Sequence, residues 1–279
     1  MNVLRFVTVS LIASFLSLLC ANHASAEAPP GLGRFIAAAK RFEELQKVAQ
    51  AKNTMPRLSD PEVRDLLRTL SDADGLFGTA RYDKNDMLVV LDACGRGNRI
   101  TMAYNFNGLS GVLDKSDSRD VMTSKVMSLQ LRNAATFQDE EISLHAFQLR
   151  CFAKLEPIMK DFVSSLPPAE WTDIRRQGLE KVRQGIVGMF HGGLMMLGIG
   201  NGPVKPENQA LMVKPENQAL MVSALAETAP TFVEMIPVAQ RKSILERAEK
   251  IVLPKELKPA LDRVIAAMSR TDCDGLCQR

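Results

Sequence analysis

Side chains that could support acid–base or metal chemistry are few in this chain. Beyond residue 26 there are two histidines, His145 and His191, and Glu141 stands four residues before His145. That spacing places Glu141 and His145 on one face of a predicted helix. Di-iron sites in helical bundles place Glu three residues before His, and catalytic zinc sites usually take three protein ligands. We therefore predict no metal site, interpret Glu141 and His145 as a surface ion pair, and expect Glu140 and Glu141 to be solvated.

Motifs for nucleophilic or nucleotide chemistry are missing. Ser110 lacks the flanking glycine spacing of a nucleophile elbow, and the glycines at 198–202 lack the strand and helix that a dinucleotide loop requires. The sequence also has no phosphate-loop Gly-Lys-Ser/Thr. We predict no catalytic residue from these motifs and no cofactor. The enzyme alternative is a hydrolase-type carboxylate and histidine site that only the fold assembles, with Asp92, Glu141 and His145 as its candidates.

The most unusual segment runs from Gln184 to Val204 and contains no Asp, Glu, Lys or Arg. Gly178, Gly185 and Gly192 recur at seven-residue spacing, so they share one face of a helix. Inside a helix, glycine costs about 1 kcal/mol relative to alanine, and three on one face predict the close approach of another backbone. We therefore expect the buried central helix of the domain here.

Two alternatives remain for this glycine-rich segment, an apolar ligand pocket and membrane insertion. In a pocket, flexible methionine side chains would supply adaptable walls. The candidate ligand-binding residues are Met189, His191, Met195 and Met196. Seven glycines, His191 and Asn201 dilute the apolar stretch, so we predict no stable transmembrane span.

Residues 1–26 are typical of a secretory signal peptide. Arg5 is their only charged residue, a short apolar stretch follows it, and Ala24-Ser25-Ala26 is typical of a cleavage site. The apolar stretch is shorter than the roughly 20 residues that span a bilayer. We expect an exported protein, periplasmic or extracellular, whose mature chain of residues 27–279 forms a single helical domain.

Four cysteines remain beyond that segment, and an even number in an oxidising compartment predicts two disulfides. Three pairings are possible. We favour Cys94–Cys151, which would cross-link two helices, and Cys273–Cys277, in which Gly275 would bend the chain. Free thiols are the alternative in either case.

The charge balance argues against two classes of partner. Without Arg5, the chain has 34 basic and 32 acidic residues. A charge this close to neutral predicts no nucleic-acid footprint and no polybasic patch for an anionic membrane. Since catalytic motifs are also missing, we expect a non-enzymatic protein that binds an apolar small molecule or a protein partner.

Helical periodicity dominates the mature chain, so we predict an all-α fold of about eight to ten helices. The ambiguous region is 87–113. Alternating apolar residues between Ile100 and Phe106, followed by Asn107-Gly108, indicate a β-hairpin. Leu88, Leu91 and Cys94 instead keep helical spacing. We favour a helix, because a lone hairpin is marginally stable.

One repeat is perfect: Val204–Met212 is copied without change as Val213–Met221. Nine extra residues inside a helix would rotate everything downstream by about 180°, which would turn the apolar face outward. We therefore predict a loop insertion at 204–221. A helix start is the alternative, and Pro206 and Pro215 agree with either position.

Overall fold

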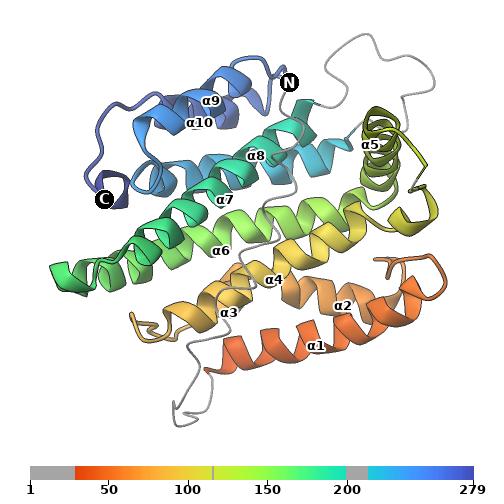
Figure 1. Ribbon diagram of the computed structural model, residues 1–279, viewed down its shortest axis with the longest axis horizontal. Helices are drawn as coiled ribbons and strands as arrows, with labels where there is room; N and C mark the ends of the chain where they lie inside the picture. Colours follow the sequence, from red (N-terminus) through yellow and green to blue (C-terminus); the bar gives the residue numbers. More distant parts are fainter. Residues whose placement is uncertain (1–28, 115, 199–212) are drawn as a thin grey trace.

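The computed structural model describes residues 29–114, 116–198 and 213–279, and these residues form an all-α bundle without strands (Figure 1). The predicted fold class is confirmed. The helices of the described residues are α1 (Pro30–Gln50), α2 (Pro61–Leu70), α3 (Ala73–Phe77), α4 (Met87–Asn105), α5 (Arg119–Thr136), α6 (Gln138–Ser165), α7 (Asp173–Gly198), α8 (Pro215–Val233), α9 (Val238–Ala248) and α10 (Lys258–Met268), with short 3-10 turns at Leu109–Gly111, Pro168–Glu170 and Leu276–Gln278.

The central helix of the bundle is α6. It packs most extensively against α4 on one side and α8 on the other, and further contacts reach α2, α3, α5 and α7. Leu144, Phe147 and Leu149 are completely buried, although they point in different directions around the helix. A helix that is buried on several faces in this way lies at the centre of its domain.

The predicted burial of the glycine-rich helix is confirmed along one face, but the prediction that this helix is central is wrong, since α6 takes that place. This helix, α7, contacts α8 and α9 and crosses the bundle obliquely in Figure 1. One face is fully buried at Ile186, Phe190 and Leu194, whereas Met195 is 47% exposed. The absence of charge misled the prediction, since glycine and methionine tolerate a half-buried position as well as a core.

The glycine row also has a different role from the one predicted. A Cβ atom added at Gly178 would meet nothing within 4 Å, whereas one at Gly192 would lie 3.0 Å from the imidazole ring of His145. The close neighbour is thus a side chain rather than another backbone. Gly192 makes room for a histidine that belongs to the central helix.

The region 87–113 is helical, as favoured, and the hairpin alternative is wrong. Helix α4 runs from Met87 to Asn105, and Gly108 at φ +79° turns the chain after it. Helix α4 packs closely against α6 at Gly97, where an added Cβ atom would lie only 3.0 Å from the Phe147 ring. The predicted Cys94–Cys151 pair joins the same two helices, with a Cα–Cα distance of 5.5 Å and both residues buried.

Two buried arginines attach the C-terminal tail to the bundle. Arg183 of α7 and Arg241 of α9 are 6% and 0% exposed. Their guanidinium groups donate to backbone carbonyl oxygens of Met235, Leu276 and Arg279 in the first case, and of Ile236, Arg270 and Asp272 in the second. The predicted Cys273–Cys277 pair lies within this tail, with a Cα–Cα distance of 5.9 Å.

The second copy of the repeat starts α8. Pro215 occupies the first turn, where its missing N–H is harmless. Lys214 forms an ion pair with Asp139 at 2.6 Å, and Asn217 donates to the same carboxylate at 2.7 Å. The loop prediction is therefore wrong for Pro215–Met221, because these contacts anchor a helix start on α6. The first copy and the predicted signal peptide lie outside the described residues.

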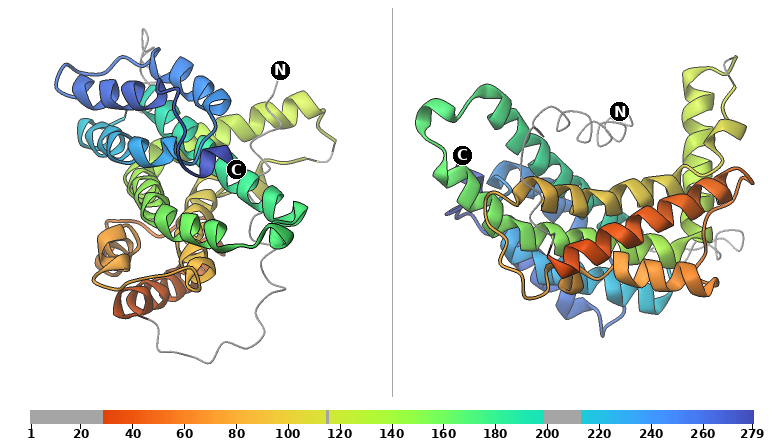
Figure 2. Two further views of the ribbon diagram at one scale, coloured as in Figure 1. Left: turned by 90° about the vertical axis from the view of Figure 1, so that its left-hand side faces the viewer. Right: turned by 90° about the horizontal axis from the view of Figure 1, so that it is seen from below.

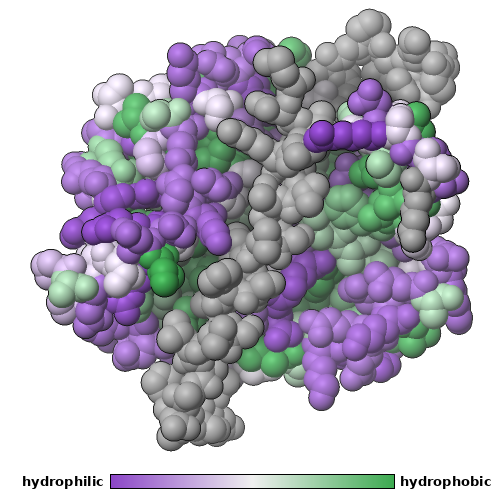
Figure 3. All heavy atoms as spheres, viewed as in Figure 1, coloured by the Kyte–Doolittle hydropathy of each residue, from purple (hydrophilic) through white to green (hydrophobic). Residues whose placement is uncertain are grey.

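The outer surface combines apolar and polar areas. Helix α5 stands away from the rest of the bundle in Figure 2, and Leu129 and Asn133 are its only fully buried residues. Figure 3 shows hydrophobic areas between hydrophilic ones rather than one continuous band on the face seen. Among the helices in the described parts of the chain, none is long and apolar enough to cross a membrane.

Candidate functional site

The four predicted ligand-binding residues of α7 do not converge on one site. His191 and Met195 line an open groove, whereas Met196 lines a small cavity on another side of the helix. Met189 lines neither of the two, and its backbone carbonyl oxygen contacts His145 at 2.8 Å. The residues predicted to line one apolar pocket thus lie at two separate sites, a large groove and a small cavity.

The larger place is a groove between α7 and α9, which we call the α7–α9 groove. Its volume is about 590 Å³, within the range of about 300–1,000 Å³ typical of small-molecule sites. Its lining residues are His191, Leu194, Met195 and Gly198 of α7, Ser243, Glu246 and Arg247 of α9, and Lys250 and Ile251 of the following turn.

Apolar side chains form one part of the groove. Leu194 is completely buried, Ile251 is half-buried and Met195 is exposed. The Ile251 Cδ1 atom lies 3.1 Å from the place where a Cβ atom at Gly198 would be, so Ile251 packs closely against the last residue of α7. The result is a closely packed apolar surface with Met195 as its movable edge.

Charged side chains form the rest of the groove. Among the described residues, Arg247 and Lys250 have no ion-pair partner, and both side chains are exposed. Glu246 is the acidic residue of the lining, and its carboxylate lies 4.0 Å from the Lys242 ammonium group. The groove therefore presents two unpaired cations beside an apolar surface.

A histidine and a serine also meet in this groove. The His191 Nε2 atom lies 3.1 Å from the Ser243 hydroxyl oxygen, and that hydroxyl donates to the Gln240 carbonyl oxygen at 3.0 Å. With the serine proton directed to Gln240, His191 is the donor in their contact. The His191 Nδ1 atom is buried and has no hydrogen-bond partner in the described part of the chain. Burial and the positive charge of Arg247 hold the pKa of His191 below its usual value.

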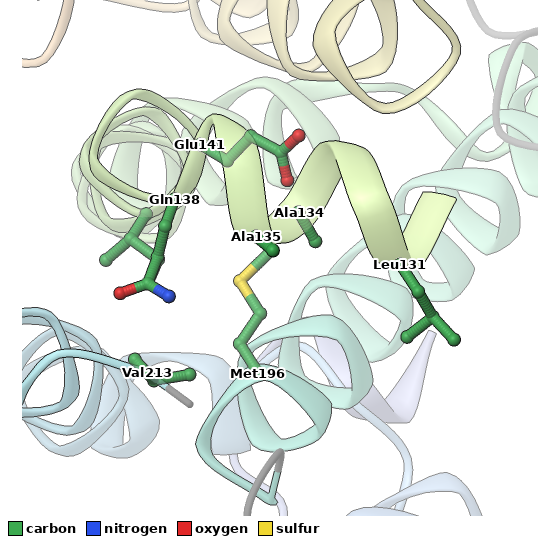
Figure 4. Close-up of a pocket in the computed structure, with 8 residues that line it drawn as sticks. Leu131, Ala134, Ala135, Gln138, Glu141, Met196 and Val213 are labelled. Carbon is green, nitrogen blue, oxygen red and sulfur yellow. The ribbon is translucent and has the colours of Figure 1, made fainter. Parts of the chain in front are cut away.

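The smaller place lies where α5 turns into α6, and we call it the corner cavity (Figure 4). Its volume is about 20 Å³, which holds about one water molecule. The Met196 side chain points toward Ala135, and the Gln138 amide points toward Val213. The lining is Leu131, Ala134, Ala135, Gln138, Glu141, Ile142, Met196 and Val213. This cavity is too small for an organic ligand.

Glu141 contributes a buried carboxyl group to the corner cavity. It is 1% exposed, and its Oε1 atom has no hydrogen-bond partner among the described residues. Burial, together with the neighbouring charge of Glu140, raises the pKa of Glu141 to about 8. Glu140 is also buried, and it accepts hydrogen bonds from the Leu58 backbone N–H at 2.9 Å and from Arg57 at 3.1 Å. The prediction that both carboxylates are solvated is wrong, since α6 is enclosed from its first turn.

His145 does not act together with Glu141. Its ring is 7% exposed, and its Nε2 atom lies 2.8 Å from the Met189 carbonyl oxygen, so this nitrogen carries the proton. Burial lowers the pKa of His145, and the hydrogen bond to the Met189 carbonyl oxygen opposes this shift in part. The predicted surface ion pair between Glu141 and His145 is wrong, because both groups are buried and no ion pair joins them. No cluster of three metal-ligating side chains occurs within the described residues.

The third residue of the predicted hydrolase-type site lies apart from the other two. The Asp92 carboxylate accepts hydrogen bonds from Arg96 and Arg99, each at 3.1 Å, and its side chain is 52% exposed. Glu141 and His145 are enclosed within the bundle and do not contact it. The structure therefore does not bring Asp92, Glu141 and His145 together.

The α9 side of the groove was missed by the sequence analysis. Ser243, Glu246, Arg247 and Lys250 are separated by three, one and three residues, which is the spacing of one helix face. The signal was present, but a polar face with this spacing is usually solvated and indicates no partner by itself.

The chain was also compared with protein-family models, curated proteins and solved structures, and none of them matches it.

Proposed function

We propose that this protein is an exported, non-enzymatic helical protein that binds the apolar part of a small molecule in the α7–α9 groove. The observation that carries the proposal is the apolar surface of Met195 and Ile251 inside a groove of about 590 Å³. Two of the four residues singled out from the sequence, His191 and Met195, line this groove.

Export is supported by the cysteines and by the first 26 residues. Cys94–Cys151 and Cys273–Cys277 lie at disulfide-bonding distance, and disulfides persist in oxidising compartments such as the periplasm and the extracellular space. The charge and length pattern of residues 1–26 agrees with this location. Mass spectrometry of the exported protein should find an N-terminus near Glu27 and no free thiol.

Hydrolysis is the alternative that the His191–Ser243 contact raises. An activated serine needs a base that takes its proton, and that base needs a third group that orients it. Here the Ser243 proton is directed to Gln240, and no carboxylate of the described residues contacts the His191 Nδ1 atom. This geometry favours binding over catalysis. Ser243→Ala should therefore leave any ester hydrolysis by the purified protein unchanged, and a loss of activity would favour the enzyme.

The binding proposal can be tested with N-phenyl-1-naphthylamine, a neutral apolar fluorophore. Its fluorescence should rise on binding, and Met195→Glu should weaken the affinity about fivefold to tenfold, because it removes about 1–1.5 kcal/mol of apolar contact. Ile174→Glu is the matched control, since Ile174 is also an exposed apolar residue of α7 but lies outside the groove. Equal affinities of the two variants would contradict a site in the groove.

A further inference from the structure

We infer that the ligand of the α7–α9 groove is an amphiphile with a single acidic head group, a carboxylate or a phosphate, which Arg247 and Lys250 bind. This inference rests on the proposed function, and it adds the chemical class of the ligand. It follows from the presence of two cations beside the apolar side chains of the groove and from the hydrogen-bond donors that these cations leave unused.

The two cations lie next to each other in space. Arg247 belongs to the last turn of α9, and the Lys250 backbone N–H donates to the Arg247 carbonyl oxygen at 3.2 Å. This tight turn brings both side chains into the lining of the groove, together with Ile251. An anion at this point would contact the guanidinium and the ammonium group while its apolar part lies along Met195 and Ile251.

The hydrogen-bonding capacity of these cations is not used by the described protein. A guanidinium group has five N–H donors and an ammonium group has three. Neither Arg247 nor Lys250 makes a side-chain hydrogen bond or an ion pair within the described residues. Arg96, by contrast, binds the carboxylates of both Asp92 and Glu43.

Nearby acidic groups reduce the positive charge of the groove but leave its donors free. Glu246 is the acidic residue among the lining residues, and it lies beside Lys242 rather than beside Arg247. The C-terminal carbonyl groups of α9 also favour basic side chains in this turn. That effect is weak and screened by solvent, whereas a carboxylate or phosphate forms charge-assisted hydrogen bonds with guanidinium and ammonium groups directly.

His191 offers an independent readout of the charge of the ligand. The positive charge of Arg247 contributes to lowering the pKa of His191, and the other charged groups of the lining are Glu246 and Lys250. An anion bound by Arg247 would offset this effect and raise the pKa of His191. A neutral ligand of the same length would not, because it leaves the charge of Arg247 unbalanced.

The test compares decanoate and decyl phosphate below their micelle concentrations, 1-decanol below its solubility limit, and acetate as the ligand without an apolar chain. We expect one or both acidic ligands to bind at least tenfold more tightly than 1-decanol, and acetate to bind far more weakly. Whichever of the two acids binds more tightly identifies the head group. Nuclear magnetic resonance of the His191 ring should show a pKa increase with the acidic ligand and none with 1-decanol.

Arg247→Gln provides the matching variant. It should weaken the binding of the acidic ligand about tenfold and leave the binding of 1-decanol unchanged. Arg263→Gln is the control, because Arg263 is an exposed arginine of α10 outside the groove, and it should change neither affinity. Equal binding of acid and alcohol would overturn this inference and leave the proposed function intact. Failure of all three decyl compounds to bind would overturn both.

Discussion

Polar side chains lie beside α7 in two regions, and they are buried in one and exposed in the other. In the first turns of α6, Glu140, Glu141 and His145 are buried. Glu140 and His145 form hydrogen bonds with other groups of the protein. In the α7–α9 groove, Arg247 and Lys250 are exposed and have no partner among the described residues. The first region contains the strongly raised pKa of Glu141, but its cavity holds about one water molecule.

A carboxyl group with a shifted pKa therefore does not identify a functional site by itself. Buried acid groups with raised pKa values are common at catalytic centres, but structural burial produces them as well. Glu141 belongs to the second kind, because no room for a substrate adjoins it. The groove has ordinary exposed cations, and it has the space that a ligand requires. Space and unused hydrogen-bonding capacity are therefore the better guide in this protein.

The largest expected effect concerns Glu141 and pH. Its pKa is about 8 in the folded protein against an ordinary value of 4.5, so the folded state binds the proton more tightly than the unfolded state does. Stability from this group is therefore complete below about pH 4.5 and is lost as the pH rises toward 8. Between pH 5 and pH 8 the loss should be on the order of 3 kcal/mol.

Glu141→Gln should remove most of this pH dependence, because the amide does not ionise. Urea unfolding at a series of pH values measures it. Glu249→Gln is the control, since Glu249 is exposed, and it should keep the slope of the unmodified protein. If Glu141→Gln kept that slope too, the buried carboxyl group would not control stability in this range.

A smaller effect should separate two glycines of the same helix. Gly178→Ala should stabilise the protein by about 0.5–1 kcal/mol, since alanine is the better helix former and nothing lies within 4 Å of the new methyl group. Gly192→Ala should destabilise it by about 1 kcal/mol, because the methyl group would meet the His145 ring at 3.0 Å. Thermal unfolding would show the two opposite signs. A gain of stability in both variants would mean that His145 does not depend on Gly192.

The smallest effect is expected for the repeat. Deleting residues 204–212 or residues 213–221 yields the same sequence, so one variant tests both. The remaining copy keeps Lys214 and Asn217 as partners of Asp139. Met196 and Val213 line one small cavity, so the end of α7 lies close to the start of α8. A connection shorter by nine residues can therefore still join the two helices. The free energy of unfolding should change by no more than about 0.9 kcal/mol, the effect of a nearly threefold change in loop length. A larger loss would show that the first copy supports the fold.

The sequence was a good guide to elements and a poor one to their arrangement. Helical spacing correctly predicted the all-α class and the helix at 87–105, and the count of cysteines led to both pairs. It could not rank α6 against α7 as the central helix, because each has an apolar stripe. Burial on several sides depends on neighbours that are distant in the chain.

The same reason explains the errors at individual side chains. Glu140 and Glu141 are polar and adjacent, which is typical of an exposed helix start. The segment around Arg57 and Leu58 covers Glu140, and the end of α7 and the start of α8 lie beside Glu141, so distant parts of the chain enclose the first turn of α6. The groove required the pairing of α7 with α9, whose residues are separated by about 50 positions, and no local pattern encodes that contact.

The most direct test of the central claim is methyl nuclear magnetic resonance of the methionines during titration with the tightest-binding decyl compound. The three methionines of α7 report on three different environments: Met195 on the groove, Met196 on the corner cavity and Met189 on neither. We predict a large shift of the Met195 signal and little change at Met189 and Met196. A shift of Met196 with an unchanged Met195 would place the ligand at the α5–α6 corner and contradict the account.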